Sequence, residues 1–295
     1  MPADPQRPPV DVVVPFAGSP EALAELAARL ERLALGHEDT ITIVDNRPGG
    51  TPAVSTGRIG AIRAPERQSS YFARNRGAVA GKNPWLLFLD ADVDPSTDLI
   101  ERYFAEPPAE RAGVLAGGVS DERVAGAERS VAARYAMLRN SMSQEHTLLT
   151  GPWGYAQTAN CAVRRLAFEE VGGFCDNVRS GGDADLCFRI KRAGWEIEAR
   201  KRATAVHRSR RTLRKLVRQR ARHGSGAAWL ARRYPGSFPR ARWLGLTKWT
   251  FTSLAGAALA SARGRSDEAV VAAVEPLLKW AFELGRLLPN EVGQG

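Results

Sequence analysis

An apolar run that ends in two acids, Pro84-Trp85-Leu86-Leu87-Phe88-Leu89-Asp90-Ala91-Asp92, gives the clearest indication of architecture in this chain. The run has the length and composition of a fully buried strand, so its carboxylates are expected at the mouth of a sheet. Earlier strands are expected at 10–15, 40–44 and 59–62, with helices at about 20–35 and 70–81. This alternation predicts an α/β fold with a mainly parallel sheet flanked by helices.

Three of these strands end in residues suited to binding. Pro15 and Phe16 end the first strand, Asp45 and Asn46 follow the second, and the acids at 90–92 follow the strand at 85–89. Because ligands of such sheets bind beyond the carboxyl ends of the strands, we expect these residues to converge on one crevice.

The second half of the chain is less regular and contains a loop rich in glycine and aromatic residues at 150–155. Strands are expected near 157–163 and 195–199, and helices at about 127–140, 182–194, 213–234, 243–262 and 267–288. The last helices predict a C-terminal helical extension.

Composition limits the class of protein. The net charge of +10 fits an anionic partner, such as a nucleotide diphosphate, nucleic acid or an anionic membrane surface. Three widely spaced cysteines without a CxxC pair are typical of reduced thiols in the cytosol: Cys161, Cys175 and Cys187. Residues 1–9 are Pro-rich, lack the apolar core of a signal peptide, and are predicted to form a flexible tail. The most apolar stretch, 244–260, contains Lys248 and is short for a bilayer span. We therefore expect a cytoplasmic protein, with peripheral attachment to the inner face of the membrane as an open alternative.

The pair Asp90 and Asp92 offers two carboxylates at i and i+2 on a turn after a buried strand. Such a pair can bind one hard cation, and Mg²⁺ or Mn²⁺ suits oxygen ligands of this kind. The alternative is a solvated turn, because Asp94-Pro95-Ser96 has the sequence of the N-cap of a following helix. The motif alone does not decide between the two.

A second acid pair, Asp183 and Asp185, lies where a glycine-containing loop enters a predicted helix. Asp183 is either the N-cap of that helix or a general base presented by the loop. Asp185 either lines the same pocket or interacts with the positive end of the helix.

Two basic side chains are candidates for the same crevice. Arg74, in the predicted helix at 70–81, can clamp a phosphate with bidentate hydrogen bonds or can keep the helix surface soluble. His207 follows a short apolar run and can complete a metal site or be an ordinary surface residue.

The order of these motifs resembles that of the family 2 glycosyltransferases with the GT-A fold. The resemblance covers roughly residues 10–225 and rests on these segments: Val13-Val14-Pro15, Val44-Asp45-Asn46, Ala73-Arg74-Asn75-Arg76-Gly77, Leu89-Asp90-Ala91-Asp92, Thr158-Ala159-Asn160-Cys161-Ala162-Val163-Arg164-Arg165, Val171-Gly172-Gly173-Phe174, Gly182-Asp183-Ala184-Asp185-Leu186 and His207. It implies a catalytic domain at 10–225, with a nucleotide-sugar half at about 10–115 and an acceptor half at about 116–225. The helical extension would then occupy 226–295.

The resemblance implies an inverting transferase that uses a nucleotide-sugar, linked to UDP, GDP or dTDP, and a divalent metal. Pro15, Phe16 and Asp45 would line the nucleoside pocket, and Arg74 would face the nucleotide. Asp90 would contact the ribose or a metal-bound water.

The same resemblance assigns the metal and the acceptor side. Asp92 would ligate Mn²⁺ or Mg²⁺, and His207 would be a further ligand. Asp183 would be the base that deprotonates the acceptor, which gives inversion at the anomeric carbon. The sugar and acceptor sites would be bordered by Trp153, Gln157, Asn160 and Asp185.

Two departures from the family pattern narrow the expected activity. Family members often carry Glu before the base, where this chain has Gly182, which puts a role of that acid in acceptor binding in doubt. The segment Gln219-Arg220-Ala221-Arg222-His223 does not match the Q-x-x-R-W motif of the processive synthases. We therefore expect a single-addition enzyme.

Basic residues crowd into the segment 200–222, including Arg210, Arg211, Arg220 and Arg222. They are expected to form a solvated face, to bind a diphosphate or anionic acceptor, or to attach the chain to an anionic membrane. Nucleic acid is a minor alternative, because aromatic residues are not interleaved with the basic ones.

Two other functions remain as alternatives to a glycosyltransferase. A nucleotidyltransferase should carry a glycine-rich phosphate loop near the first strand, where this chain has only Ala17-Gly18-Ser19. An inactive relative could instead serve as a basic adaptor that binds membranes or nucleic acid.

Overall fold

The computed structural model describes residues 7–49, 58–121, 130–140, 143–208 and 212–292. Within these ranges one mixed sheet has eight strands in the order β3-β2-β1-β4-β7-β6-β8-β5. The strands are β1 (Val10–Phe16), β2 (Thr40–Asp45), β3 (Ile59–Arg63), β4 (Trp85–Leu89), β5 (Val93–Pro95), β6 (Ala112–Asp121), β7 (Asn160–Arg164) and β8 (Glu196–His207). The helices are α1 (Pro20–Leu30), α2 (Ser70–Ala80), α3 (Leu99–Phe104), α4 (Val131–Arg139), α5 (Glu145–Leu148), α6 (Arg165–Glu170), α7 (Gly182–Arg192), α8 (Leu213–Arg233), α9 (Trp243–Ala262) and α10 (Ser266–Gly285).

The first four strands pair in parallel, as the sequence predicts. β1 lies between β2 and β4, and β3 forms the edge beside β2. β7 then enters antiparallel between β4 and β6, and β8 runs parallel to β6. The sheet is therefore mainly parallel at one side and mixed at the other.

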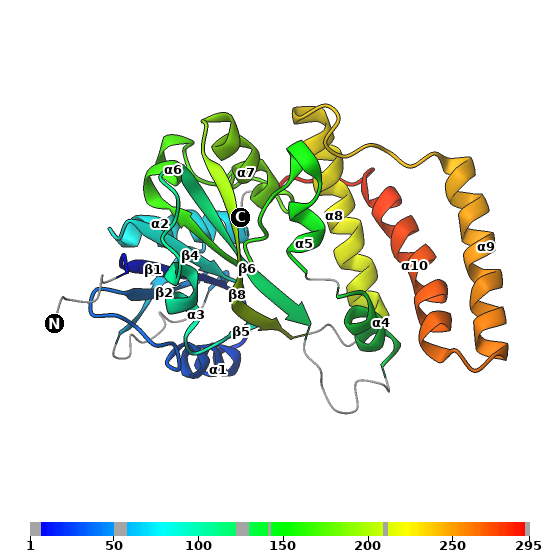
Figure 1. Ribbon diagram of the computed structural model, residues 1–295, viewed down its shortest axis with the longest axis horizontal. Coiled ribbons are helices and arrows are strands. Elements are labelled where there is room, and N and C mark those ends of the chain that lie inside the picture. The colour runs from blue at the N-terminus through cyan, green and yellow to red at the C-terminus, as the bar shows by residue number, and fades with distance from the viewer. Residues whose placement is uncertain (1–6, 50–57, 122–129, 141–142, 209–211, 293–295) are drawn as a thin grey trace.

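Helices cover both faces of the sheet (Figure 1). The alternating side chains of β1 point to opposite faces, so Val12 and Val14 join a core with α1 and α3, while Val13 joins one with α2, α6 and α7. Ser19 is the N-cap of α1, and its hydroxyl accepts a hydrogen bond from the N–H of Ala22. This layering holds the strand ends in fixed positions.

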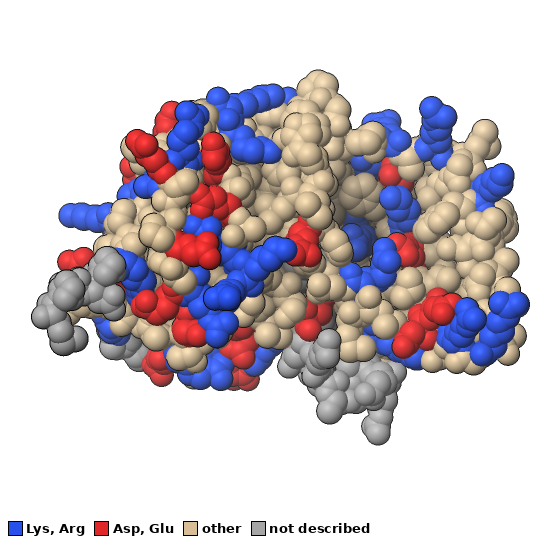
Figure 2. Space-filling view, in the orientation of Figure 1, with Lys and Arg blue, Asp and Glu red and all other residues tan. Residues whose placement is uncertain are grey.

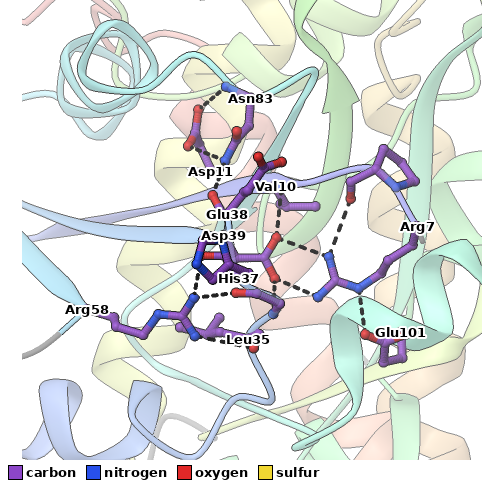
Figure 3. A network of polar contacts seen from close by, with 12 residues as sticks. Arg7, Val10, Asp11, Leu35, His37, Glu38, Asp39, Arg58, Asn83 and Glu101 are labelled. Atoms are coloured by element: carbon purple, nitrogen blue, oxygen red, sulfur yellow. Dashed lines mark hydrogen bonds and ion pairs between the residues drawn. The ribbon is translucent and has the colours of Figure 1, made fainter.

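Arg7 ties the start of the chain to the sheet, as Figure 3 shows. Its guanidinium lies 2.5 Å from the Asp39 carboxylate and 2.6 Å from the Glu101 carboxylate. Asp39 also accepts hydrogen bonds from the N–H groups of Val10 and Gly36. The predicted flexible tail at 1–9 is thus wrong for residues 7–9, because an ion pair fixes them, and residues 1–6 lie outside the described part.

The C-terminal helices form the predicted extension, and Figure 1 shows α8, α10 and α9 side by side at one end of the molecule. α4, α8 and α10 share a small apolar core that includes Tyr135, Leu216 and Leu278. α8 is a single helix from 213 to 233, so the predicted boundary at 225/226 falls inside it and divides no packed unit. Among the described residues, no helix combines the length and apolar character needed to cross a membrane.

The sequence predicted neither the short β5 nor β6, which is the longer of the two strands. The β6 segment contains Gly113, Gly117 and Gly118, which weaken the pattern of a strand. A side chain at 117 would collide with the hydroxyl of Tyr103 and the amide of Asn160, so the crowded sheet requires glycine there. The predicted helix at 127–140 is shorter in the structure, 131–139, and residues 122–129 lie outside the described part.

Candidate functional site

The carboxyl ends of β1, β2 and β4 lie side by side. Phe16 and Asp45 are register partners at the ends of β1 and β2, and Val13 pairs with Phe88 of β4. Asp90 follows β4 directly, and its N–H donates to the Ala159 carbonyl at 3.3 Å. The sheet therefore brings the predicted nucleoside residues and the acidic turn to one edge.

Asp92 faces His207 across the junction of β5 and β8. The Nε2 atom of His207 lies 3.4 Å from Oδ2 of Asp92, and its Nδ1 atom lies 3.0 Å from Oδ1 of Asp121. The backbone fixes both contacts, because His207 is the register partner of Val93 on one side and of Asp121 on the other. The Asp92 side chain keeps 44% of its surface exposed, whereas those of His207 and Asp121 are buried.

The charge of His207 follows from its two carboxylate neighbours. Burial alone would lower the pKa of His207, but the hydrogen bonds and charges of Asp121 and Asp92 raise it to about 9. A metal ion can bind Nε2 only when this nitrogen carries no proton, because both would use the same electron pair. Protonation of His207 therefore competes with metal binding.

A divalent metal fits the donor types at this pair. Among the described residues, no group of three or more His, Cys, Asp and Glu side chains is arranged to hold an ion. Asp92 and His207 would supply one oxygen and one nitrogen, and Mg²⁺ or Mn²⁺ commonly completes its shell with water and substrate phosphates. The Asp121–His207 contact matches the carboxylate–histidine arrangement that orients metal-binding imidazoles.

Arg74 connects the acidic turn to α2. Its guanidinium forms a short ion pair with Asp90 and lies 5.6 Å from the ring centroid of Tyr71 and 5.9 Å from that of Phe174. The side chain is buried, while about a third of the Asp90 side chain, 34%, is exposed. Burial raises the pKa of Asp90; Arg74 opposes this effect, and the Asp92 carboxylate adds to it.

Asp183 lies in the first turn of α7 and is half-buried. The N-cap of this helix is Gly181, in a left-handed conformation with φ 88°, so Asp183 is not the N-cap that the sequence left as an alternative. Its Oδ1 accepts a hydrogen bond from Tyr71 at 3.4 Å and one from the N–H of Ala184 at 3.1 Å. Burial raises the pKa of Asp183, and the Arg74 charge opposes that rise.

At the nucleoside side, Asp45 is fully buried and engaged by Arg47. Arg47 donates from Nε to Oδ1 at 2.9 Å and from Nη2 to Oδ2 at 2.7 Å. Its guanidinium lies 5.7 Å from the ring centroid of Phe16. Pro15 is partly exposed beside them. Arg47 thus covers Asp45, and a ligand would meet the arginine first.

Two predicted acceptor residues are engaged inside the protein. Asp185 is fully buried, with Arg189 at 2.7 Å from Oδ2, and with Tyr234 at 2.7 Å and Arg233 at 3.0 Å from Oδ1. Asn160 is fully buried too, and it accepts from the Tyr103 hydroxyl at 2.8 Å. Both side chains contribute to the packing of the fold, and their role in an acceptor site stays a prediction.

The other two predicted acceptor residues lie nearer the surface. Trp153 is partly exposed, and its ring packs 5.1 Å from that of Phe188 on α7. Gln157 is partly exposed as well, and Gln144 fixes its backbone through a 2.7 Å hydrogen bond to its N–H. Part of each side chain is therefore exposed to solvent.

The described residues of the basic segment 200–222 lie in different environments. Arg200 pairs with Glu198 at 2.5 Å, and Lys201 with Glu145 at 2.8 Å. Arg222, on α8, lowers the pKa of Tyr71, although burial and Asp183 raise that pKa overall. Part of α8 therefore adds positive potential to the site, while Arg210 and Arg211 lie outside the described part.

Sequence reasoning missed Asp121, Tyr71 and Arg47. Asp121 ends the glycine-rich β6, so no strand pattern marked it as a strand end. Tyr71 precedes Arg74 by three residues and therefore shares its helix face, which is a signal that the sequence did contain.

Comparisons with known proteins identify the family of the chain. The model of the family described as "Glycosyltransferase like family 2" matches residues 7–226. The pre-mycofactocin glycosyltransferase of Mycobacterium tuberculosis is 28% identical over 251 residues, which cover 79% of this chain and 50% of that protein. Glycosyltransferase AglE of Haloferax volcanii is 29% identical over 161 residues, which cover 55% of this chain and 51% of that protein. The chain spans about half the length of the curated relatives it matches.

Two solved structures share the architecture at low identity. The mannosyltransferase PcManGT from Pyrobaculum calidifontis, in complex with GDP-Man and Mn²⁺, superposes with a TM-score of 0.56 at 15% identity, covering 95% of this chain and 74% of that one. GalNAc-T7 with UDP, GalNAc and Mn²⁺ gives a TM-score of 0.50 at 14% identity, covering 77% of this chain and 52% of that one. At such identities the likeness concerns the fold, and it confirms the predicted GT-A architecture.

Proposed function

Because the chain belongs to the glycosyltransferase-like family 2, we propose that it transfers one sugar from a nucleotide-diphosphate donor to an acceptor hydroxyl, with inversion at the anomeric carbon. The donor is a UDP-, GDP- or dTDP-sugar. GDP-Man and UDP are the ligands named for the two proteins with similar folds, which supports a donor of this class.

One observation carries this proposal: a chain of side-chain contacts links the two acid motifs. Asp183 accepts a hydrogen bond from Tyr71, the Tyr71 ring lies beside the Arg74 guanidinium, and Arg74 pairs with Asp90. The segments that carry these residues are far apart in the sequence, and the GT-A fold brings them together at the strand ends.

In the reaction, Asp183 acts as the general base. Its carboxylate takes the proton of the acceptor hydroxyl while the acceptor oxygen forms a bond to the anomeric carbon. The bond from that carbon to the diphosphate oxygen breaks, and the diphosphate leaves with the electron pair. The charge of Arg74 favours the developing negative charge on the leaving group.

Asp92 and His207 would hold Mn²⁺ or Mg²⁺, which when bound neutralises charge on the leaving diphosphate. Asp121 would act as a positioning residue, since it accepts from Nδ1 of His207 and leaves Nε2 directed toward Asp92. Phe16 and the Arg47–Asp45 pair would contact the nucleoside, and Asp90 the ribose or a metal-bound water.

The test is donor binding by the full chain. Thermal unfolding is recorded with UDP-, GDP- and dTDP-sugars, each with and without Mn²⁺ or Mg²⁺, and donor hydrolysis is followed by release of the nucleotide. We expect one nucleotide class to raise the unfolding temperature only with metal, and Asp92→Ala to remove that rise. If no donor is bound or hydrolysed with either metal, the transferase proposal is wrong and an inactive adaptor takes its place.

A further inference from the structure

Helix α9 lies at the edge of the molecule and packs against α10, as Figure 1 shows. The side of α9 that faces α10 buries Leu246, Ala257 and Ala260. Thr250 on the same side accepts a 2.9 Å hydrogen bond from Trp280 of α10. These contacts fix which side of α9 points outward.

The outward side of α9 is apolar as well. Leu244 is 88% exposed and Phe251 70%, and Leu254 and Leu259 are also exposed. At 3.6 residues per turn these side chains project away from the Leu246–Ala260 side, with Ala255 and Ala258 between them. A helix that is apolar all round is normally buried, so an exposed one indicates an interaction surface.

Most charges next to this surface are basic, although Asp267 and Glu268 begin α10 and Glu268 lies 3.5 Å from Arg265. Arg240 and Arg242 precede the helix, Arg263 and Arg265 follow it, and Lys248 lies on the outward side; all of them are exposed. α9 contains no Asp or Glu. Figure 2 shows this end of the molecule as a largely uncharged expanse, with Lys and Arg at its margins and Asp and Glu beside some of them at its lower edge.

We propose that the outward face of α9 docks on an anionic lipid surface, with the helix lying in the plane of the interface. The apolar side chains would enter the headgroup region while the arginines at both ends contact lipid phosphates. Lys248 can extend its ammonium to the headgroups while its methylenes stay among the apolar side chains.

The same charges disfavour a second copy of the chain as the occupant. In an antiparallel pair of α9 helices, Arg240 and Arg242 of one copy would face Arg263 and Arg265 of the other. In a parallel pair, Arg240 and Arg242 would face the same two residues of the other copy, and Arg263 and Arg265 would do likewise. Both orientations place like charges together, which costs free energy at an interface. An anionic surface instead complements Arg240, Arg242, Lys248 and Arg263, while Arg265 already pairs with Glu268.

The experiment is sedimentation of the full chain with lipid vesicles. One set contains phosphatidylcholine alone, and the other contains phosphatidylcholine with phosphatidylglycerol. We expect binding to the anionic set, weaker at high salt, and a loss of about tenfold or more in Leu244→Glu/Phe251→Glu, since each glutamate removes apolar contact and adds repulsion. The matched control is Val79→Glu/Leu166→Glu, which places two glutamates at exposed apolar positions of α2 and α6 and should bind as the unsubstituted chain does.

Two results would overturn the proposal. One is equal binding of Leu244→Glu/Phe251→Glu and the unsubstituted chain, or no binding of the latter to anionic vesicles. The other is a dimer in analytical ultracentrifugation that this variant dissociates, which would make a second copy the occupant. Metal-dependent donor binding measured on the same variant separates this proposal from the catalytic one, because α9 contributes no residue to the site.

Discussion

The two edges of the parallel strands carry the same residue type in opposite surroundings. At the amino-terminal edge, Asp39 and Asp11 are almost fully buried, and groups of the chain bond both oxygens of each (Figure 3). At the carboxyl edge, Asp92 and Asp183 keep part of their surface open to solvent. A carboxylate whose oxygens are all engaged stabilises the fold, whereas one that a ligand can reach is available for chemistry. Substitution should therefore reduce stability at one edge and activity at the other.

The largest effect is expected for Asp183→Asn. The amide keeps the shape but cannot accept the acceptor proton, so transfer should fall by about 100- to 10,000-fold. Donor binding with Mn²⁺ and the unfolding temperature should be retained. Transfer assays with a responsive acceptor, beside calorimetric donor titrations, check this. Normal transfer by the variant would remove Asp183 from the mechanism.

The pH profile gives a second measurement on the same residue. Burial raises the pKa of Asp183, and the group must be deprotonated to act as a base. Transfer should therefore decline as the pH falls through this raised pKa, at a higher pH than for an ordinary aspartate. Donor affinity, measured in parallel, shows whether the decline belongs to the chemical step.

A stability effect is expected at the other edge for Asp39→Ala. The substitution leaves the nearly buried Arg7 without its main partner, which should cost about 3–5 kcal/mol of unfolding free energy. Glu101→Ala is the matched control, because Glu101 pairs with the same arginine but is exposed, and its loss should cost at most about 1 kcal/mol. Urea unfolding measures both. If both substitutions lower the unfolding free energy equally, burial does not make the Arg7–Asp39 pair stronger than the Arg7–Glu101 pair.

Acid unfolding should reflect the same pair. Burial alone would raise the pKa of Asp39, but Arg7 and the N–H groups of Val10 and Gly36 lower it overall. A folded-state pKa below the unfolded one adds stability above the unfolded value, about pH 4. This contribution is lost as the pH falls through the lower folded value, and Asp39→Asn should lack that dependence.

The sequence predicted the carboxyl edge better than it predicted the individual roles. Buried apolar runs determine where β1, β2 and β4 end, so the convergence of Phe16, Asp45 and Asp90 followed from pattern alone. Asp183 and Asp185 are two residues apart and look equivalent in the sequence. Only the packing of α8 against α7 distinguishes them, because Tyr234 and Arg233 engage Asp185 and leave Asp183 at the surface.

Asp121 shows a second limit of sequence reasoning. Its strand, β6, contains glycines that the crowding around Tyr103 and Asn160 requires, and such residues have no strand propensity. Asp121 contacts His207 because of the register in which β6 pairs with β8, and this register shifts at two points along the strands. A local sequence pattern does not specify such shifts.

Asp121→Asn should sharpen the comparison further, because Asp121 is a buried acid at the carboxyl edge. The amide can donate to Nδ1 of His207, which would favour the wrong tautomer for a metal ligand at Nε2. We expect Mn²⁺ affinity to fall by about 10- to 100-fold. Calorimetric titration with Mn²⁺ and nucleotide measures the affinity. Nitrogen NMR of His207 in the metal-free protein reports the tautomer at a pH above its pKa of about 9, where the ring is neutral.

Asp94→Asn is the matched control for that measurement, since Asp94 is an exposed acid on β5 that pairs with Arg32. It should bind Mn²⁺ as the unsubstituted chain does. If Asp121→Asn leaves both the affinity and the tautomer unchanged, Asp121 has no positioning role.

Apart from the control substitutions, the smallest effect is expected for Tyr234→Phe, which tests whether Asp185 belongs with the structural acids. The tyrosine hydroxyl donates to Asp185 at 2.7 Å, and its loss should cost about 1.5 kcal/mol of unfolding free energy, since Arg189 and Arg233 continue to hold the carboxylate. Transfer rate and donor affinity should stay unchanged, because the contact connects α7 to α8 and is buried from any ligand. If the variant is as stable as the unsubstituted chain but uses the acceptor poorly, Asp185 belongs to the acceptor site. Burial alone would then no longer distinguish the structural acids from those that act in catalysis.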